Sequence, residues 1–360
     1  MKNKLDFGII GHQVEWPVIS GMINQWRDGD MEPVGEADVK RLFPVFPPRS
    51  LFDIVVNSTQ GLKAHGKYIE SFLSPEHILK QGHIKENIEK IQKSARVAIK
   101  HGIEITTLGG FTSIVLEGNL GLLEESEDSI FTTGNSLTSA LVCKGIEEAA
   151  PLLSIDLTQS KLLVLGATGD IGTACARYFG DKVEEMILVA RNERRLLKHE
   201  QALGFDNSWA TTDLAAVLPE ADVIIAVASS ADIPMTNHKP GVLILDAGYP
   251  HNLRVSDIRS DAHLFYGGMG HVSGDYTFTP NYQTAMYCFP HPKVAHGCIL
   301  ESVVLSFENI FEPYSSGRGN ITVESMARIM AMSEKHGIGL APFYNDKGMW
   351  KLQLPQHATL

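Results

Sequence analysis

Cysteine is scarce in this sequence. The 360 residues contain four cysteines, and no two of them form a Cys-x-x-Cys pair. Disulfide frameworks of secreted domains and structural zinc sites both need cysteines at closer and more regular spacing. The sequence therefore favours neither, and no metal site is expected.

Long hydrophobic runs are also lacking. No stretch reaches the roughly 18 unbroken apolar residues that a membrane helix requires. The N-terminus carries two lysines before an interrupted apolar run that ends at Gly11 and His12, without the small-residue cleavage site of a secretory signal. We expect a soluble, cytoplasmic protein without a transmembrane segment.

Positive charge does not dominate the chain. The 31 Lys and Arg residues face 42 Asp and Glu residues, which gives a formal net charge of −11. This balance argues against nucleic-acid binding through the surface as a whole. One segment departs from it, because 191–198 carries four cations in eight positions. The segment can bind phosphate or an acidic partner, or it can be the solvated face of a helix.

The length indicates more than one structural unit, since a single hydrophobic core usually stops growing below this size. We expect an α/β substrate domain over 1–154. Its strand-like runs are Phe7–Ile10 and Phe52–Val56, and its helices are expected over Glu86–His101, before Gly102, and over Ser136–Leu153. The prolines of Phe43–Pro48 predict an extended connector.

The middle region, 155–285, alternates apolar runs with helical stretches. Continuous apolar runs are typical of parallel strands that are buried on both faces. We therefore expect a central Rossmann-type, doubly wound parallel sheet that binds a dinucleotide. The four runs are Lys161–Leu165, Met186–Ala190, Val223–Val227 and Val242–Leu245.

The last region, 286–360, is expected to be helical. Apolar residues recur at helical spacing over Lys293–Phe311 and again over Ile321–His336, where Gly337 marks an end.

A glycine-rich segment follows the first strand of the middle region. Gly166, Gly169 and Gly172 stand between a strand and a helix, which is the context of a dinucleotide-binding loop. The first glycine permits a tight turn, the second permits close approach of pyrophosphate, and the third permits close packing of helix on strand. The predicted cofactor-binding residues of this loop are Gly166, Ala167, Thr168, Gly169, Asp170, Ile171 and Gly172.

Arg191 indicates which dinucleotide binds. It lies 25 residues beyond Gly166, at the end of the next strand, where an acidic residue would favour NAD. A guanidinium there can hold the 2′-phosphate of NADPH, although an exposed arginine at a strand end is the alternative. Ala228 and Ser229 end a later strand, and we expect them, with 246–250, to border the nicotinamide.

A cysteine thiolate can exchange with an acyl thioester and hold the acyl group while hydride reduces it. Cys298 is one candidate, since nearby His291, Lys293 and His296 are expected to lower its pKa. Cys288 is a comparable rival on these grounds. The remaining two cysteines lie in apolar helical segments, where packing is the better interpretation: Cys143 and Cys175.

Several ordered blocks carry a resemblance to a known family. They are 7–12 (FGIIGH), 65–71 (HGKYIES), 101–103 (HGI), 108–114 (LGGFTSI), 131–135 (FTTGN), 166–172 (GATGDIG) and 190–192 (ARN). In these blocks the chain resembles the cyanobacterial-type long-chain acyl-(acyl carrier protein) reductases over nearly its whole length. Lys67 departs from the pattern, in which we expect arginine.

The resemblance implies both a reaction and a nucleophile. In the family, an apolar helix that ends in Phe-Glu follows the catalytic cysteine, and here Cys298 is followed by Phe307 and Glu308. The implied activity is NADPH-dependent reduction of a fatty acyl thioester to a fatty aldehyde through an acyl-enzyme. Acyl carrier protein is the implied donor, with coenzyme A as the alternative, and an aldehyde-consuming enzyme is a further implied partner.

A general acid must protonate the departing thiol or the tetrahedral oxygen, and His296, His271 and His65 are candidates. Side chains that can orient a carbonyl, or else form turns and caps, are Asn135, Thr133 and Ser113. Two other functions stay open. One is a carbonyl reductase of the shikimate-dehydrogenase type, with Lys67 as the acid-base group and no covalent step, and the other is a non-catalytic NADP-sensing protein.

Overall fold

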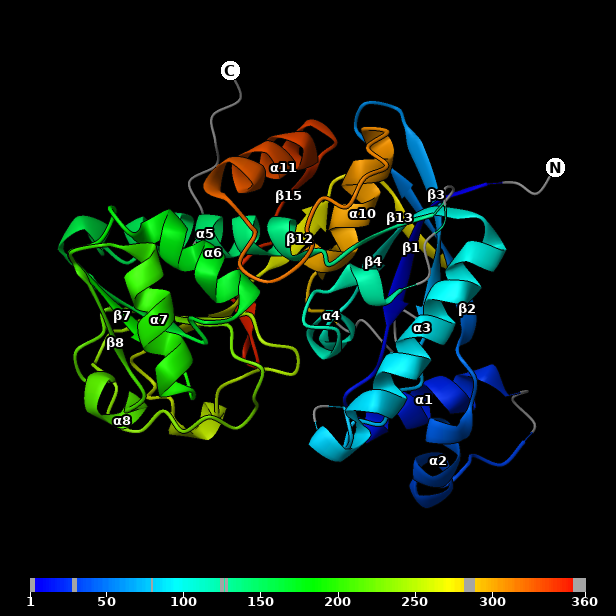
Figure 1. Cartoon of the computed structure of the whole chain (residues 1–360), viewed down its shortest axis with the longest axis horizontal. Helices are drawn as coiled ribbons and strands as arrows, with labels where there is room; N and C mark the ends of the chain where they lie inside the picture. The colour runs from blue at the N-terminus through cyan, green and yellow to red at the C-terminus, as the bar shows by residue number, and fades with distance from the viewer. Residues whose placement is uncertain are drawn as a thin grey trace. The chain divides into compact units, whose positions relative to one another are not determined.

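Two units make up the chain, and neither is continuous in sequence (Figure 1). The computed structural model describes residues 4–27, 31–78, 80–123, 126, 129–281 and 289–351. Unit 1 takes in the described parts of Met1–Ser136, His271–Arg318 and Ala331–Gly339. Unit 2 takes in those of Leu137–Gly270, Gly319–Met330 and Leu340–Leu360.

This grouping differs from the expected division at residues 154 and 285. The chain returns to unit 1 after Gly270, because helix α10 (Gly297–Phe307) packs against strands of that unit and covers an apolar face. The region 286–360 is therefore not a separate body. It is also not wholly helical, since strand β14 (Val294–His296) precedes α10 where a helix was expected from Lys293.

Unit 2 contains the parallel sheet that the apolar runs predicted. Six parallel strands lie in the order β11-β10-β9-β6-β7-β8, which is the strand order of dinucleotide-binding Rossmann folds. The prediction of an α/β protein with a Rossmann-like parallel sheet is confirmed. The strands are β6 (Lys161–Leu165), β7 (Glu185–Val189), β8 (Ser208–Thr211), β9 (Val223–Ala226), β10 (Leu243–Asp246) and β11 (His263–Tyr266). The helices of this sequence range are α5 (Asn135–Leu152), α6 (Asp170–Phe179), α7 (Glu193–Leu203) and α8 (Leu214–Val217).

Unit 1 has a mixed sheet of six strands in the order β13-β2-β3-β1-β4-β5. The four strands β3, β1, β4 and β5 run parallel, whereas β2 and β13 are joined antiparallel. The carboxyl ends of the four parallel strands therefore meet at one edge of the sheet. The strands are β1 (Leu5–Gly11), β2 (Arg49–Asn57), β3 (Lys63–Glu70), β4 (Ile103–Leu108), β5 (Ile130–Thr132) and β13 (Tyr276–Thr279).

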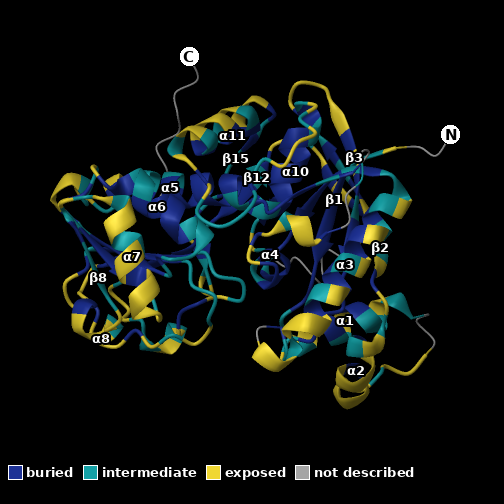
Figure 2. Cartoon of the chain, in the orientation of Figure 1, coloured by how far each residue is buried: buried dark blue, intermediate teal, exposed yellow. Residues whose placement is uncertain are grey.

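Two helices cover the two faces of this sheet. Alternation along a strand sends neighbouring side chains to opposite faces. Ile69 and Leu108 join the apolar cluster that includes Ile91 of α3 (Ile84–His101), while Thr107 bonds to Cys298 of α10. Helix α10 is buried along almost its whole length (Figure 2), as a helix that is apolar on all sides must be.

Local signals placed several element ends correctly. Helix α3 ends where Gly102 adopts the left-handed conformation, with a φ of 69°, as its sequence predicted. The expected extended connector over Phe43–Pro48 begins instead with a 3₁₀ turn, because Pro44 occupies a first-turn position that needs no N–H donor.

The remaining elements complete the fold. They are α1 (Trp16–Trp26), α2 (Glu36–Leu42), α4 (Phe111–Val115), α11 (Val323–Lys335), β12 (Met269–Val272), β15 (Ile338–Leu340), β16 (Tyr344–Asn345), β17 (Gly348–Met349) and the 3₁₀ turns at Phe43–Val45, Gln81–His83, Leu120–Leu122, Leu157–Gln159 and Val255–Asp257. Among the described residues, no helix is long and apolar enough to cross a membrane.

Candidate functional site

Cys298 lies at the edge of the unit 1 sheet where the parallel strands end. It is the second residue of α10, and His296 caps that helix. The hydroxyl of Thr107, at the end of β4, donates a hydrogen bond of 2.8 Å to the Cys298 carbonyl. Cys298 is partly exposed, whereas its neighbours along the helix are buried. The arrangement places a partly exposed cysteine in the first turn of a helix.

Gly134 fixes the position of this thiol from the other side. It follows β5 with a φ of 75°, and a Cβ placed on it would lie 2.5 Å from the Cα of Cys298. Only glycine combines this backbone conformation with so close an approach. The block of residues 131–135 that carried the family resemblance therefore packs directly on the candidate nucleophile.

Burial governs the acidity of the thiol. It raises the pKa of Cys298 to about 11, although the backbone N–H groups of Gly110, Ile299 and Cys298 itself lower the pKa by hydrogen bonding. The expectation that nearby cations lower this pKa is wrong. The charges of His291 and Lys293 act on His271 instead, whose pKa they lower together with burial.

His12 is a site residue that sequence reasoning named only as part of a block. It follows β1, is buried, and its Nε2 accepts the Phe111 N–H at 2.8 Å. Burial, together with the charge of His296, lowers its pKa to about 4, although a hydrogen bond with the Gln13 backbone acts in the opposite direction. A polar residue directly after a parallel strand was the signal that could have found it.

The three histidines proposed as acids lie in different places. His296 is next to the thiol along the chain and close enough to His12 to act on its charge. His271 on β12 contacts the ring of His291, with centroids 4.9 Å apart. His65 is exposed near the amino end of β3, where its N–H bonds to Asp6. Of the three, His296 is the one that lies beside Cys298 along the chain.

Lys67 lies on the other face of the sheet. It forms an ion pair with Asp53 on β2. Lys67 and Ile69 are two residues apart on β3, so their side chains point to the same face of the sheet. Ile69 packs in the apolar cluster under α3. Since Cys298 lies on the α10 face, the structure does not bring Lys67 to the thiol.

The residues proposed to orient a carbonyl are hydrogen-bonded within the protein, Thr133 and Ser113 through their hydroxyls and Asn135 through its backbone. Thr133 donates to Ser315 Oγ at 2.9 Å, and that same oxygen accepts the N–H of Asn135 at 3.2 Å. Ser113 donates to the Gly110 carbonyl at 3.1 Å. Glu301, fully buried one turn after Cys298, accepts from Ser315 at 2.7 Å. These contacts shape the backbone around the thiol.

The glycine loop of unit 2 has the form that its sequence predicted. Gly166 has a φ of 92°, and a Cβ on Gly172 would lie 2.3 Å from the Gly166 carbonyl oxygen. Gly169 donates its N–H to the same oxygen at 2.9 Å and caps α6. The loop therefore leaves its backbone and the α6 N-terminus open to a phosphate. Of the other loop residues, Ala167 is buried, and Thr168, Asp170 and Ile171 are partly exposed.

Two guanidinium groups flank this loop. Exposed Arg191 donates to Ser229 Oγ at 3.4 Å, and Arg195 of α7 donates to the Thr168 carbonyl at 3.4 Å. Both contacts are long, and both lie beside the predicted phosphate site. Arg195 belongs to the cationic segment 191–198. The sequence alone did not show whether this residue lies near a phosphate or on a solvated helix face.

A buried amide organises the neighbouring strand ends. Asn252 accepts the Ala228 N–H at 2.7 Å and donates to the carbonyls of Ala228 and Ser230 at 2.8 and 2.7 Å. Its own N–H bonds to the buried carboxylate of Asp246 at 2.8 Å. The two strand ends expected to border the nicotinamide are thus tied together.

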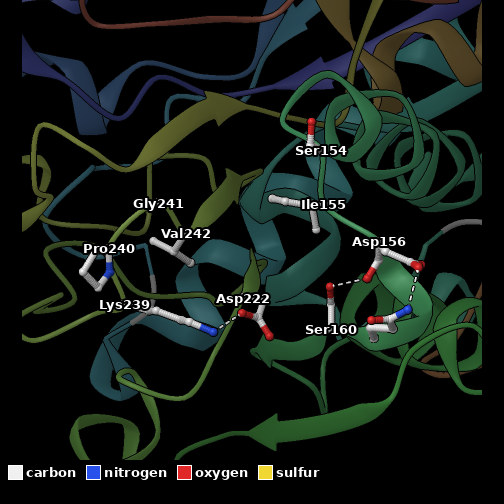
Figure 3. A pocket seen from close by; sticks show the side chains of 10 residues that line it. Ser154, Ile155, Asp156, Ser160, Asp222, Lys239, Pro240, Gly241 and Val242 are labelled. Atoms are coloured by element: carbon white, nitrogen blue, oxygen red, sulfur yellow. Dashed lines mark hydrogen bonds and ion pairs between the residues drawn. The ribbon is translucent and has the colours of Figure 1, made fainter.

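A pocket lies elsewhere in unit 2, at the amino ends of its strands (Figure 3). Asp222 points toward Lys239 there and forms an ion pair with it. Ligands of open α/β sheets bind at the carboxyl ends, so this pocket is not the dinucleotide site. Its lining residues are Ser154, Ile155, Asp156, Gln159, Ser160, Asp222, Lys239, Pro240, Gly241 and Val242.

The other three cysteines and the possible metal ligands provide no second candidate site among the described residues. Cys143 and Cys175 are buried in unit 2 with sulfurs 3.8 Å apart, and burial raises the pKa of Cys143. Cys288 lies outside the described residues. Within the described part of the chain, no group of three or more His, Cys, Asp or Glu side chains is placed to hold a metal ion.

Comparison with known proteins finds relatives that match much of the chain. The chain is 37% identical over 303 residues to the long-chain acyl-(acyl-carrier-protein) reductase of Synechococcus elongatus, across 81% of this chain and 87% of that protein. It is 27% identical over 251 residues to aminotransferase PigE of a Serratia species, across 68% of this chain but only 29% of that longer protein. No protein-family model matches the chain.

Solved structures resemble the chain weakly. One component of the dipicolinate synthase from Bacillus halodurans shares 15% identity at a TM-score of 0.34, over 62% of this chain and 70% of that one. An L-alanine dehydrogenase shares 14% identity at a TM-score of 0.29, over 42% of this chain and 50% of that one.

Proposed function

The chain belongs to the family of long-chain acyl-(acyl-carrier-protein) reductases, and on this premise we propose that it reduces a long-chain acyl-(acyl carrier protein) to a fatty aldehyde with NADPH. It is an oxidoreductase by family. The observation that carries the proposed mechanism is the position of Cys298, which is partly exposed in the first turn of α10, where backbone N–H groups lower the pKa of its thiol against burial.

Cys298 is the proposed nucleophile. Its thiolate attacks the acyl carbonyl, the bond from that carbonyl to the carrier sulfur breaks, and the acyl group becomes a thioester of Cys298. Because the pKa of the free thiol is about 11, a base must take its proton. We assign the role of this base to His296, which accepts the thiol proton and then donates it to the departing carrier sulfur.

The acyl-enzyme is then reduced. NADPH, when bound, supplies the hydride that reduces the thioester carbonyl. The N–H donors around Cys298 stabilise the oxyanion of the resulting tetrahedral hemithioacetal, which collapses to release aldehyde and the Cys298 thiolate. Fixed donors of this kind are worth most where they face charge that develops during the reaction.

The preference for NADPH is assigned to Arg191 and Arg195. The glycine loop fits a dinucleotide, since Gly166 and Gly172 leave no room for side chains in the tight turn, and Gly169 leaves the backbone bare where pyrophosphate approaches. The two guanidiniums beside it match the additional charge of a 2′-phosphate. A cytoplasmic location and a downstream aldehyde-consuming partner remain predictions from the sequence.

One assay series tests this function. The purified protein is given NADPH or NADH with thioesters of graded chain length on acyl carrier protein and on coenzyme A. We expect one fatty aldehyde per NADPH consumed, with the highest kcat/KM on a long-chain carrier-protein thioester. Constant NADPH absorbance with every thioester would contradict the proposal and favour an NADP-sensing role.

The carbonyl-reductase alternative receives no support from the geometry. It requires Lys67 at the reacting centre, but that lysine is paired with Asp53 on the face that α3 covers.

A further inference from the structure

The turn after β4 has almost all of its backbone polar groups engaged. The Gly109 N–H donates to Ile10 O at 2.9 Å. The carbonyl of Gly109 accepts the Thr112 hydroxyl at 2.7 Å, and that of Gly110 accepts the Ser113 hydroxyl at 3.1 Å. Both peptide planes of the turn are therefore held in place.

The two remaining N–H groups have different partners. The Gly110 N–H acts on Cys298, where as a hydrogen-bond donor it lowers the pKa of the thiol against the larger effect of burial. The next N–H, that of Phe111, donates to His12 Nε2 at 2.8 Å. Gly110 has a φ of 56° and a ψ of −132°, a conformation that depends on glycine. A turn in this conformation keeps its orientation only where its neighbours hold it.

His12 can hold the turn because it is a neutral acceptor. Nε2 accepts a hydrogen bond and so carries no proton, which assigns the proton of the neutral ring to Nδ1. The ring is 3% exposed and stacks on the ring of Phe111, with centroids 5.7 Å apart. Burial keeps His12 uncharged at neutral pH.

We propose that His12 is a positioning residue, whose Nε2 fixes the Gly110–Phe111 peptide so that the Gly110 N–H points at the Cys298 sulfur and at the oxyanion that forms beside it. The inference rests on the proposed acyl-enzyme function but assigns His12 no proton transfer. In this role His12 need not touch the acyl group or the thiol. It acts through the turn.

Two substitutions separate this role from acid-base catalysis. His12→Gln places an amide oxygen near the position of Nε2 and keeps the acceptor, whereas His12→Phe keeps a ring against Phe111 and loses the acceptor. His65→Gln is the matched control, because His65 is exposed and lies near the amino end of β3, whereas Cys298 lies at the carboxyl ends of the parallel strands. Thr112→Val, which removes the hydroxyl bonds to Gly109 O at 2.7 Å and to Ile10 O at 3.4 Å, perturbs the same turn if His12→Phe fails to fold.

The first readout is the rate at which iodoacetamide modifies Cys298 at pH 9, followed by peptide mass mapping. This readout needs no acyl substrate, so it decides the role of His12 even if acyl-(acyl carrier protein) is not reduced. The second readout is kcat, with KM for the thioester and Kd for NADPH measured alongside.

We expect alkylation to slow by about tenfold and kcat to fall by about tenfold to a hundredfold in His12→Phe. His12→Gln should recover both rates to within about threefold, with KM and Kd little changed. Wild-type alkylation and kcat in folded His12→Phe, or in Thr112→Val if His12→Phe does not fold, would overturn the proposal. So would a His12→Gln variant as slow as His12→Phe, which would indicate proton transfer by the imidazole.

Discussion

The α-carbon of Gly134 lies against the backbone of Cys298. A Cβ at residue 134 would lie 2.5 Å from Cys298 Cα and 2.6 Å from its carbonyl oxygen. The residue after the end of β5 thus leaves no room for a side chain against the start of α10, and this contact sets the position of the candidate nucleophile.

Gly134→Ala should disable the site. The added methyl group has no flexible neighbour to displace, so α10 or the turn after β5 must move. We expect acylation of the thiol to fall by at least about a hundredfold, because a shift of about 1 Å at a reacting centre costs this much. Intact-protein mass spectrometry and a thermal melt measure the two effects.

Gly102→Ala is the control for backbone strain alone. Gly102 has a similar φ of 69°, but nothing lies within 4 Å of a Cβ placed there. It should cost about 1 kcal/mol of stability and leave acylation unchanged. Equal acylation rates in the two alanine variants would show that the contact with Cys298 does not matter.

Arg191→Ala should weaken NADPH binding but not NADH binding. A charge-assisted hydrogen bond to a phosphate is worth about 1.5–3 kcal/mol, so Kd for NADPH should rise by roughly tenfold to a hundredfold. Fluorescence titration with both cofactors measures it. Arg194→Ala is the control, since Arg194 is exposed on α7. An unchanged cofactor preference in Arg191→Ala would remove this residue from the 2′-phosphate site.

Asn252→Ala should loosen the strand ends beside the cofactor. The change breaks three hydrogen bonds to Ala228 and Ser230 and leaves partly buried backbone groups without partners. We expect the free energy of unfolding to fall by about 2–4 kcal/mol and NADPH binding to weaken. Urea unfolding measures the free energy of unfolding, and titration measures NADPH binding. Asn207→Ala, which loses one hydrogen bond to Val183, is the comparison. A variant with wild-type values for both would argue against this account of the strand ends.

Glu70 should make the stability of the protein depend on pH. The carboxyl group is fully buried, and burial raises its pKa from 4.5 to about 7 despite hydrogen bonds from Phe72, Gln13 and Tyr68. The folded state therefore binds a proton more tightly than the unfolded state does. The resulting stabilisation is complete below pH 4.5 and is lost as the pH rises through 7.

Glu70→Gln removes this titration. Between pH 4.5 and 7 the wild-type protein should lose on the order of 3 kcal/mol of unfolding free energy relative to the glutamine variant. Urea unfolding at several pH values measures the difference. Parallel stability curves for the two proteins would show that Glu70 is already ionised.

Local patterns predicted the features that depend on short stretches of chain. Val223–Ala226 is a buried parallel strand, as its continuous apolar run predicted, because such strands are covered on both faces. Gly166 stands where only glycine fits. The helix end at Gly102 followed from the left-handed conformation that glycine adopts readily.

Contacts between distant segments could not be predicted in this way. The acceptor His12 and the donor N–H of Phe111 are separated by 99 residues, and no periodicity relates them. Lys67 was considered as an acid from the sequence, but its side chain points to the same sheet face as Ile69, which packs under α3. The pKa of Cys298 was expected to fall because charges near it in sequence were counted, whereas burial by distant segments decides it.

The central claim is that Cys298 carries the acyl group. The direct measurement is intact-protein mass spectrometry after addition of a long-chain acyl-(acyl carrier protein) without NADPH, on the wild-type protein and on Cys298→Ala. We predict one acyl adduct on the wild-type chain, mapped to the Cys298 peptide and removed when NADPH is added, and none on the variant. Full acylation of Cys298→Ala would contradict it.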